Sequence, residues 1–187
     1  MSPFFLALLS TGLASFGGRD QLLVAQLAGR LGPSRILLAI AWFASAFTAA
    51  LAALAGMGIA LLLPPAAKAM LAGFALLAGA VEMAWPWRWR RTEEPTRSAF
   101  AILIVLIAAQ IGDGARFLVL AVAVATGEPV LAAFGGALGG GAALTLGWAQ
   151  GAAWGKGDRL RRLRLMIAGI LALAGVIIAL SARGLLG

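Results

Sequence analysis

The sequence predicts an all-α integral membrane protein with six transmembrane helices in two inverted three-helix repeats. Three observations carry this prediction: the long apolar segments, the uneven placement of basic residues, and a pattern shared by the two halves. The 187 residues are 62% hydrophobic and 12% charged, whereas soluble domains carry about 25% charged residues. A soluble protein with a very apolar core is excluded because several segments exceed the ~20 residues that span a bilayer as a helix.

Six apolar segments are separated by turn signals and charged loops. Turns are indicated at Gly32-Pro33, at Pro64-Pro65 and at Glu128-Pro129, and residues 88–97 form a basic loop. Backbone groups in lipid must be hydrogen-bonded internally, so each segment is predicted to be a helix. The predicted spans are residues 3–29, 36–63, 66–85, 98–126, 130–154 and 165–182.

Basic residues divide unevenly between the two sides of a six-span bundle. One side receives 11 lysines and arginines, including those of residues 88–97 and 156–164, and the other receives Lys68 and Arg183. Cytoplasmic loops are rich in Lys and Arg, so the first side is predicted to be cytoplasmic. Both termini then lie outside, and we expect the inner membrane of a bacterium. This placement explains the formal charge of +8 without a nucleic-acid partner; lipid is the expected surroundings.

The two halves of the chain match at a nearly constant offset. Gly17 corresponds to Gly112, Pro33 to Pro129, and Gly73 to Gly169. The predicted units are residues 1–87, a cytoplasmic loop of residues 88–97, and residues 98–187. Three spans per half mean that the second half enters the membrane from the opposite side, which is the plan of many secondary transporters. A duplicated bundle with no transport role is the alternative.

Charged and polar residues lie in the middle of the first and fourth spans. Charges at that depth rarely face lipid and commonly mark ion or proton paths. The repeat suggests two ion pairs, Asp20 with Arg116 and Asp113 with Arg19; these pairs either lock the halves together or open when an aspartate takes a cation or proton. Flanking glycines weaken the helix and free carbonyl groups. These glycines are Gly17, Gly18, Gly112 and Gly114.

Both stretches resemble the motif of the Gdt-type cation exchanger family, which includes the Golgi manganese transporters and their bacterial relatives. That motif is Glu-x-Gly-Asp-Lys/Arg-Thr/Ser, once in the first helix of each repeat. Residues 110–113 stand where Glu-x-Gly-Asp would, so Asp113 keeps its motif identity and Gln110 replaces the glutamate. In residues 15–20, Ser15 takes the glutamate position and Asp20 the hydroxyl position.

The resemblance implies exchange of a divalent cation, Mn²⁺ or Ca²⁺, for protons through a midplane site. It implies a metal site of Asp113, Asp20, Gln110 and Ser15, with Arg19 and Arg116 holding the carboxylates when the site is empty. The alternatives are transport of another small solute on the same fold, or a non-transporting structural module. No histidine or cysteine is present, and we expect no enzyme activity and no bound cofactor. Glu82 is expected at the interface or as an entry ligand.

Overall fold

The computed structural model describes residues 2–32, 34–85, 98–151 and 158–184, and within these ranges the chain forms helices and no strand. The all-helical class predicted from the sequence is confirmed for these ranges, and the predicted loop 88–97 lies outside them. The helices are α1 (Pro3–Ser15), α2 (Arg19–Leu31), α3 (Arg35–Ala60), α4 (Pro65–Ala84), α5 (Ala99–Ile111), α6 (Gly114–Thr126), α7 (Pro129–Gln150) and α8 (Asp158–Ala182).

Local sequence explains several helix ends. Proline occupies the first turn of α1, α4 and α7, where its missing N–H costs no helical hydrogen bond. The Ser34 hydroxyl accepts from the backbone N–H of Leu37 at 3.1 Å and so caps α3. Gly127 ends α6 with φ +70°, a left-handed conformation that favours glycine.

The described helices provide four or five candidate membrane spans, where the sequence predicted six. Helices α3, α4, α7 and α8 are each long and apolar enough to cross a bilayer. Helices α5 and α6 pass the same test only as a pair and are bent by 60° at their junction. The predicted first span is divided into α1 and α2. The last predicted span begins earlier than expected, because α8 starts at Asp158.

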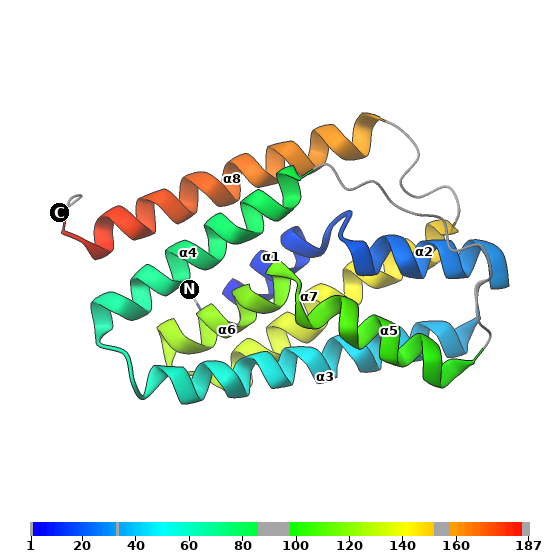
Figure 1. Cartoon of the computed structure of the whole chain (residues 1–187), viewed down its shortest axis with the longest axis horizontal. Coiled ribbons are helices and arrows are strands. Elements are labelled where there is room, and N and C mark those ends of the chain that lie inside the picture. The colour runs from blue at the N-terminus through cyan, green and yellow to red at the C-terminus, as the bar shows by residue number, and fades with distance from the viewer. Residues whose placement is uncertain (1, 33, 86–97, 152–157, 185–187) are drawn as a thin grey trace.

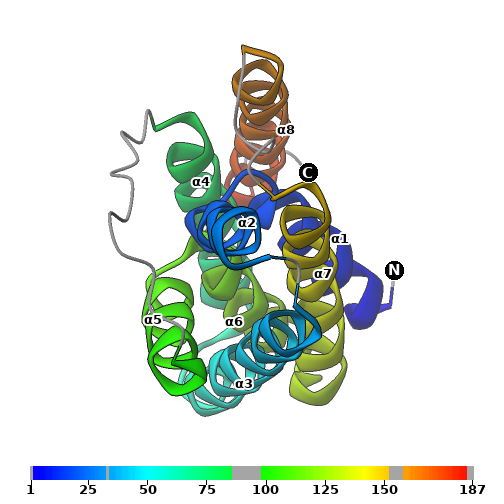
Figure 2. The same cartoon turned by 90° about the vertical axis from the view of Figure 1, so that its right-hand side faces the viewer.

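Helix α7 packs against α1, α2, α3 and α6. Figure 1 shows the helices running roughly along the long axis of the molecule, and Figure 2 looks along that axis, with α6 central and α4 and α8 paired at one side. The two breaks, between α1 and α2 and between α5 and α6, both lie away from the ends of the bundle (Figure 1). At each break one side chain beside the bend, that of Asp20 or Asp113, is buried.

Glycines let the neighbours of α7 approach its backbone. A Cβ atom on Gly139 would lie 2.5 Å from the carbonyl oxygen of Leu8 in α1, and one on Gly141 would lie 2.6 Å from the ring of Trp42 in α3. A Cβ atom on Gly147 would lie 2.7 Å from the carbonyl oxygen of Gln21 in α2. Small residues at such spacing are typical of close helix packing in lipid.

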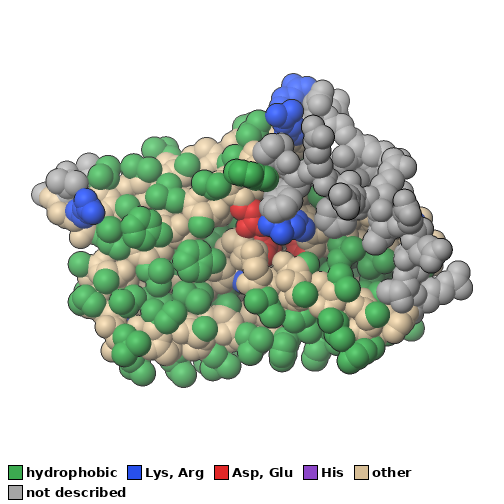
Figure 3. All heavy atoms as spheres, viewed as in Figure 1, with side chains coloured by type: hydrophobic (Ala, Val, Ile, Leu, Met, Phe, Trp, Pro, Cys, Tyr) green, Lys and Arg blue, Asp and Glu red, His purple; other side chains and the backbone are tan. Residues whose placement is uncertain are grey.

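The described surface is strongly apolar, and the interior, although mostly apolar, also holds polar and charged side chains. Large apolar side chains such as Phe43, Phe74 and Phe100 are exposed, and Figure 3 shows one face largely covered by hydrophobic side chains, with acidic and basic ones gathered at its middle. The buried set includes nine polar or charged residues: Thr11, Ser15, Asp20, Gln21, Ser45, Thr48, Gln110, Asp113 and Arg116. This distribution fits a protein whose apolar surface faces lipid.

Candidate functional site

Both charged stretches fall at helix breaks. Helix α1 ends at Ser15 and α2 begins at Arg19, and between them Gly17 has φ +70°. Helix α5 ends at Ile111 and Asp113 caps α6, accepting from the backbone N–H of Ala115 at 3.3 Å. The site thus brings together the ends of four half-length helices.

The predicted break glycines have different structural roles. A Cβ atom on Gly18 would lie 2.9 Å from Asp20 Oδ1, and one on Gly114 would lie 2.7 Å from Glu82 Oε2. Gly17 needs its left-handed φ. A Cβ atom on Gly112 would meet nothing within 4 Å among the described atoms, and its φ is −93°. Gly112 is therefore the one of the four whose position has room for a side chain.

A chain of hydrogen bonds connects Asp20 to Arg116. Arg116 Nε donates to Thr48 Oγ1 at 2.7 Å, the Thr48 hydroxyl lies 2.8 Å from Gln110 Oε1, and Gln110 Nε2 donates to Asp20 Oδ2 at 3.2 Å. The three hydrogen bonds can all be donated in one direction along the chain, from the Arg116 guanidinium toward the Asp20 carboxylate. The Thr48 hydroxyl is equally close to the carbonyl oxygen of Ala44, at 2.8 Å, so this link can switch between two acceptors.

The ends of this chain are held by further polar contacts. Asp20 Oδ1 accepts from the backbone N–H of Gln21 at 2.8 Å, and Arg116 Nη2 donates to Ser45 Oγ at 3.2 Å. A Cβ atom on Gly140 would lie 2.9 Å from Arg116 Nη1, so the guanidinium rests on bare α7 backbone. Asp20 and Arg116 are 1% and 3% exposed, and an acid and a base from different halves are thus buried in one network.

Gln21 fixes the first break in the bundle. Its side-chain Nε2 donates to the carbonyl oxygen of Ala143 in α7 at 2.5 Å, and its Oε1 accepts from the backbone N–H of Gly17 at 2.5 Å. The side chain is fully buried. Because a buried amide needs partners for both its donor and its acceptor, these contacts set the position of α2 relative to α7.

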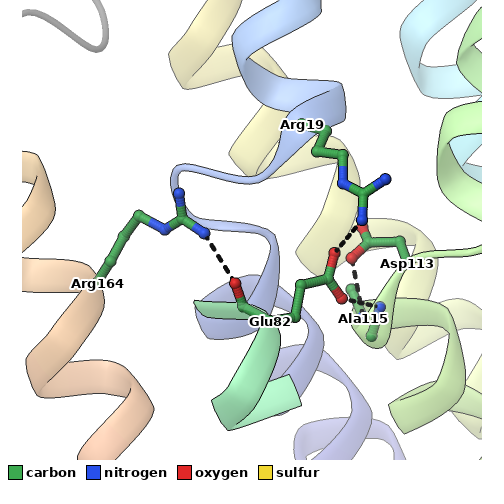
Figure 4. A network of polar contacts seen from close by, with 6 residues as sticks. Arg19, Glu82, Asp113, Ala115 and Arg164 are labelled. Carbon is green, nitrogen blue, oxygen red and sulfur yellow. Dashed lines mark hydrogen bonds and ion pairs between the residues drawn. The ribbon is translucent and has the colours of Figure 1, made fainter. Parts of the chain in front are cut away.

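A second, outer cluster surrounds Glu82 near the end of α4 (Figure 4). Glu82 Oε2 accepts from the backbone N–H of Gly114 at 2.5 Å, and Glu82 Oε1 lies 3.8 Å from Arg19 Nη2. The carbonyl oxygen of Glu82 accepts from Arg164 Nη2 at 3.2 Å. An anionic side chain at the first N–H groups of a helix is stabilised by the helix dipole, so Glu82 caps α6 from a different helix.

The direct ion pair of Asp20 with Arg116 that was expected from the repeat needs correction. Asp20 and Arg116 do not touch; Gln110 and Thr48 separate them. Arg19, expected beside Asp113, has Glu82 as its ion-pair partner. Arg19 starts α2 with its side chain 42% exposed, whereas Arg116 is the third residue of α6 and is buried.

The four predicted cation ligands are partly brought together. Asp20 and Gln110 are in contact, and the backbone N–H of Asp113 donates to the carbonyl oxygen of Gln110 at 3.1 Å. Ser15 is fully buried at the end of α1, and its carbonyl oxygen accepts from the N–H of Gly18 at 3.0 Å. Within the described residues, no group of three or more Asp, Glu, His or Cys side chains is placed to hold a metal ion.

Several site residues were missed by the sequence reasoning. Ser45 and Thr48 lie three residues apart in the apolar sequence of α3, and this pairing of hydroxyls on one helix face was a usable signal. Glu82 was considered only as an interfacial or entry residue. Arg164 was assigned to a cytoplasmic loop, because nothing in the sequence indicated that α8 would extend upstream to Asp158.

Comparisons with protein-family models, with curated proteins and with solved structures give no match to this chain.

Proposed function

We propose that this protein is a secondary transporter that exchanges a cation for protons at the two helix breaks. One observation carries the proposal: Asp20 and Asp113 are buried at these breaks, and they accept hydrogen bonds from backbone N–H groups and from the Gln110 amide. Ionisable groups inside a membrane protein are costly and are usually paired with charges or used in transport. Carboxylates held mainly by amide groups keep the capacity to bind a cation or a proton.

The arrangement of the halves supports this proposal. Helix α3 packs on α7, and α4 on α8; each of these pairs joins helices at corresponding positions of the proposed repeats. Broken helices near the centre of the membrane, contributed by two inverted repeats, are a common plan for substrate sites in secondary transporters. With six crossings, the excess of basic residues on one side would place both termini outside.

For the cargo we propose a divalent cation, Mn²⁺ or Ca²⁺. Such hard cations prefer several oxygen ligands, and oxygens are available from Asp20, Asp113, Gln110 and Ser15. Arg116 would balance the charge of Asp20 through Gln110 and Thr48 when no cation is bound. In this scheme the protons of the return step bind the same carboxylates that release the cation.

A different small solute is the second candidate, and one observation favours it. Arg116 Nη1 is buried and has no hydrogen-bond partner in the described part of the chain. A guanidinium in this state would bind a solute that carries a carboxylate or another acceptor. On this alternative the fold stays the same and the arginine binds the cargo.

Uptake into proteoliposomes separates these functions. The vesicles would hold a pH-sensitive dye and contain either the unaltered protein or one of three variants: Asp20→Asn, Asp113→Asn and Glu128→Gln. Mn²⁺ or Ca²⁺ would be added outside the vesicles. Glu128 is exposed just before α7, so Glu128→Gln is a matched control. We expect cation uptake with opposed proton movement, kept by Glu128→Gln and lost by both aspartate variants. No flux of either cation from folded protein would overturn the proposal, leaving another solute or a structural module.

A further inference from the structure

Three buried polar atoms on the α1 side of the site lack a hydrogen-bond partner. They are Thr11 Oγ1, Ser15 Oγ and Arg116 Nη1, and no described residue supplies a partner to them. Thr11 and Ser15 are fully buried and Arg116 is 3% exposed. More than about 90% of buried polar groups in proteins are hydrogen-bonded to protein or to ordered water, so three such atoms in one bundle need an explanation.

The packing of the helices places these atoms at one level of the bundle. Thr11 and Ser15 are four residues apart and share a face of α1. Gly12, which follows Thr11 in α1, packs on α7: a Cβ atom on Gly12 would lie 3.7 Å from Gly139 Cα. A Cβ atom on Gly140, the next residue of α7, would lie 2.9 Å from Arg116 Nη1. Adjacent residues on α7 thus set Thr11 and the guanidinium at the same height.

The contacts between α1 and α6 agree with this placement. Ala14 of α1 and Ala115 of α6 belong to one apolar cluster, and Ala7 and Val119 belong to another. Thr11 lies between Ala7 and Ala14 along α1, and Arg116 lies between Ala115 and Val119 along α6. Thr11 and Arg116 therefore both lie between the levels of these two apolar clusters.

Asp20 adjoins the same level. A Cβ atom on Gly18 would be 2.9 Å from Asp20 Oδ1 and 3.0 Å from the carbonyl oxygen of Ser15, so the carboxylate lies at the end of α1 that carries the Ser15 hydroxyl. Both Asp20 oxygens already accept hydrogen bonds from Gln21 and Gln110. Each carboxylate oxygen has a second lone pair that can accept another.

The missing partner must accept from a guanidinium N–H, and it must donate to or accept from the two hydroxyl groups. Water meets these requirements. We infer that ordered water occupies the layer between α1, α6 and α7, bonded to Thr11, Ser15 and Arg116 Nη1, and that it delivers the exchanged proton to Asp20. The second half of this inference rests on the proposed exchange function. In the delivery step a hydronium ion in the layer transfers one proton to the Asp20 carboxylate, leaving water and a neutral carboxyl group.

Thermal unfolding in detergent tests the hydration without relying on transport. The variants are Thr11→Val, which has nearly the same shape, and Ser15→Ala, with Ser10→Ala as control because the Ser10 hydroxyl bonds to the carbonyl oxygen of Leu6 at 2.6 Å. In a hydrated layer, losing a hydroxyl deprives water of a partner and lowers the Tm by about 2–4 °C. In a dry layer the same change removes an unsatisfied group and raises the Tm. A rise for both variants overturns the inference.

Proton movement in the vesicle assay tests the second half. We expect Thr11→Val to slow cation-driven proton movement and Ser10→Ala to leave it unchanged; Ser15→Ala is compared only in the Tm measurement, because Ser15 is also a proposed cation ligand. If the unaltered protein moves no cation, the proposed function fails, while the Tm comparison still decides the hydration. If exchange proceeds at the normal rate in Thr11→Val, the proton route is wrong. A third comparison tests for an anion in place of water. If chloride raises the Tm of the unaltered protein above its value in gluconate, and Thr11→Val abolishes that difference, an anion occupies the layer and the inference is overturned.

Discussion

The two helix breaks carry an acid and a base each, but they use them in opposite ways. At the first break the acid, Asp20, is 1% exposed and enters the inner network, while the side chain of Arg19 is 42% exposed. At the second break the base, Arg116, is 3% exposed, while Asp113 lies at the edge of the buried set at 9%. Each break therefore contributes one charged residue to the inner network, Asp20 or Arg116, and one to the edge of that network, Arg19 or Asp113.

This difference has an energetic meaning. A charge buried without compensation costs several kcal/mol, so Asp20 and Arg116 depend on each other and on Gln110 and Thr48. Of the two border charges, Arg19 keeps contact with solvent, and an ion pair of that kind contributes less than about 1 kcal/mol. The inner network should therefore determine stability, and the outer one should be easy to alter.

Replacing each arginine by methionine should give the largest contrast between the breaks. Arg116→Met leaves the Asp20 charge buried without its counterpart, and we expect a loss of about 3–5 kcal/mol in the free energy of unfolding. Arg19→Met should lose less than about 1 kcal/mol. Chemical unfolding of both variants in the same detergent measures the difference. Equal losses would show that the two breaks are energetically equivalent.

The glycines of the two breaks should also respond unequally. Gly17→Ala forces an alanine into φ +70° and sets its Cβ 2.8 Å from Arg164 Cδ, and we expect a loss of about 1–2 kcal/mol. Gly112→Ala meets open space at φ −93° and should change stability by less than about 1 kcal/mol, in either direction. The same unfolding measurement applies. A comparable loss in Gly112→Ala would mean that this glycine is needed for a conformation other than the one described.

The smallest effect is expected at Glu82. Glu82→Gln removes the charge facing Arg19 but keeps an oxygen for the Gly114 N–H, so the free energy of unfolding should fall by about 0.5 kcal/mol or less. Glu82→Ala also removes the cap of α6 and should lose about 1 kcal/mol. Thermal or chemical unfolding of the two variants side by side checks the order. A larger loss in Glu82→Gln would show that the charge, and not the cap, fixes α6.

The sequence predicted the features that depend on local chemistry. Glycines mark both breaks, because glycine weakens a helix; the side-chain cap that Asp113 provides for α6, which α2 lacks, was not predicted. The identity of the partners depends on contacts distant in the sequence. Thr48 lies 68 residues from Arg116, and no local pattern indicates that a threonine would separate the arginine from Asp20. Arg164 was missed because helix ends are the least certain part of such a prediction.

The pairing of α4 with α8 bears on how the chain is made. Helix α4 packs more extensively on α8 than on any helix of its own half, and Gly73 and Gly175 face each other so closely that a Cβ on either would be within 3.0 Å of the other's carbonyl oxygen. During synthesis α4 emerges long before α8. The face of α4 around Gly73 therefore stays uncovered until α8 is inserted. A chain truncated before α8 would leave that face exposed to the quality-control machinery of the cell.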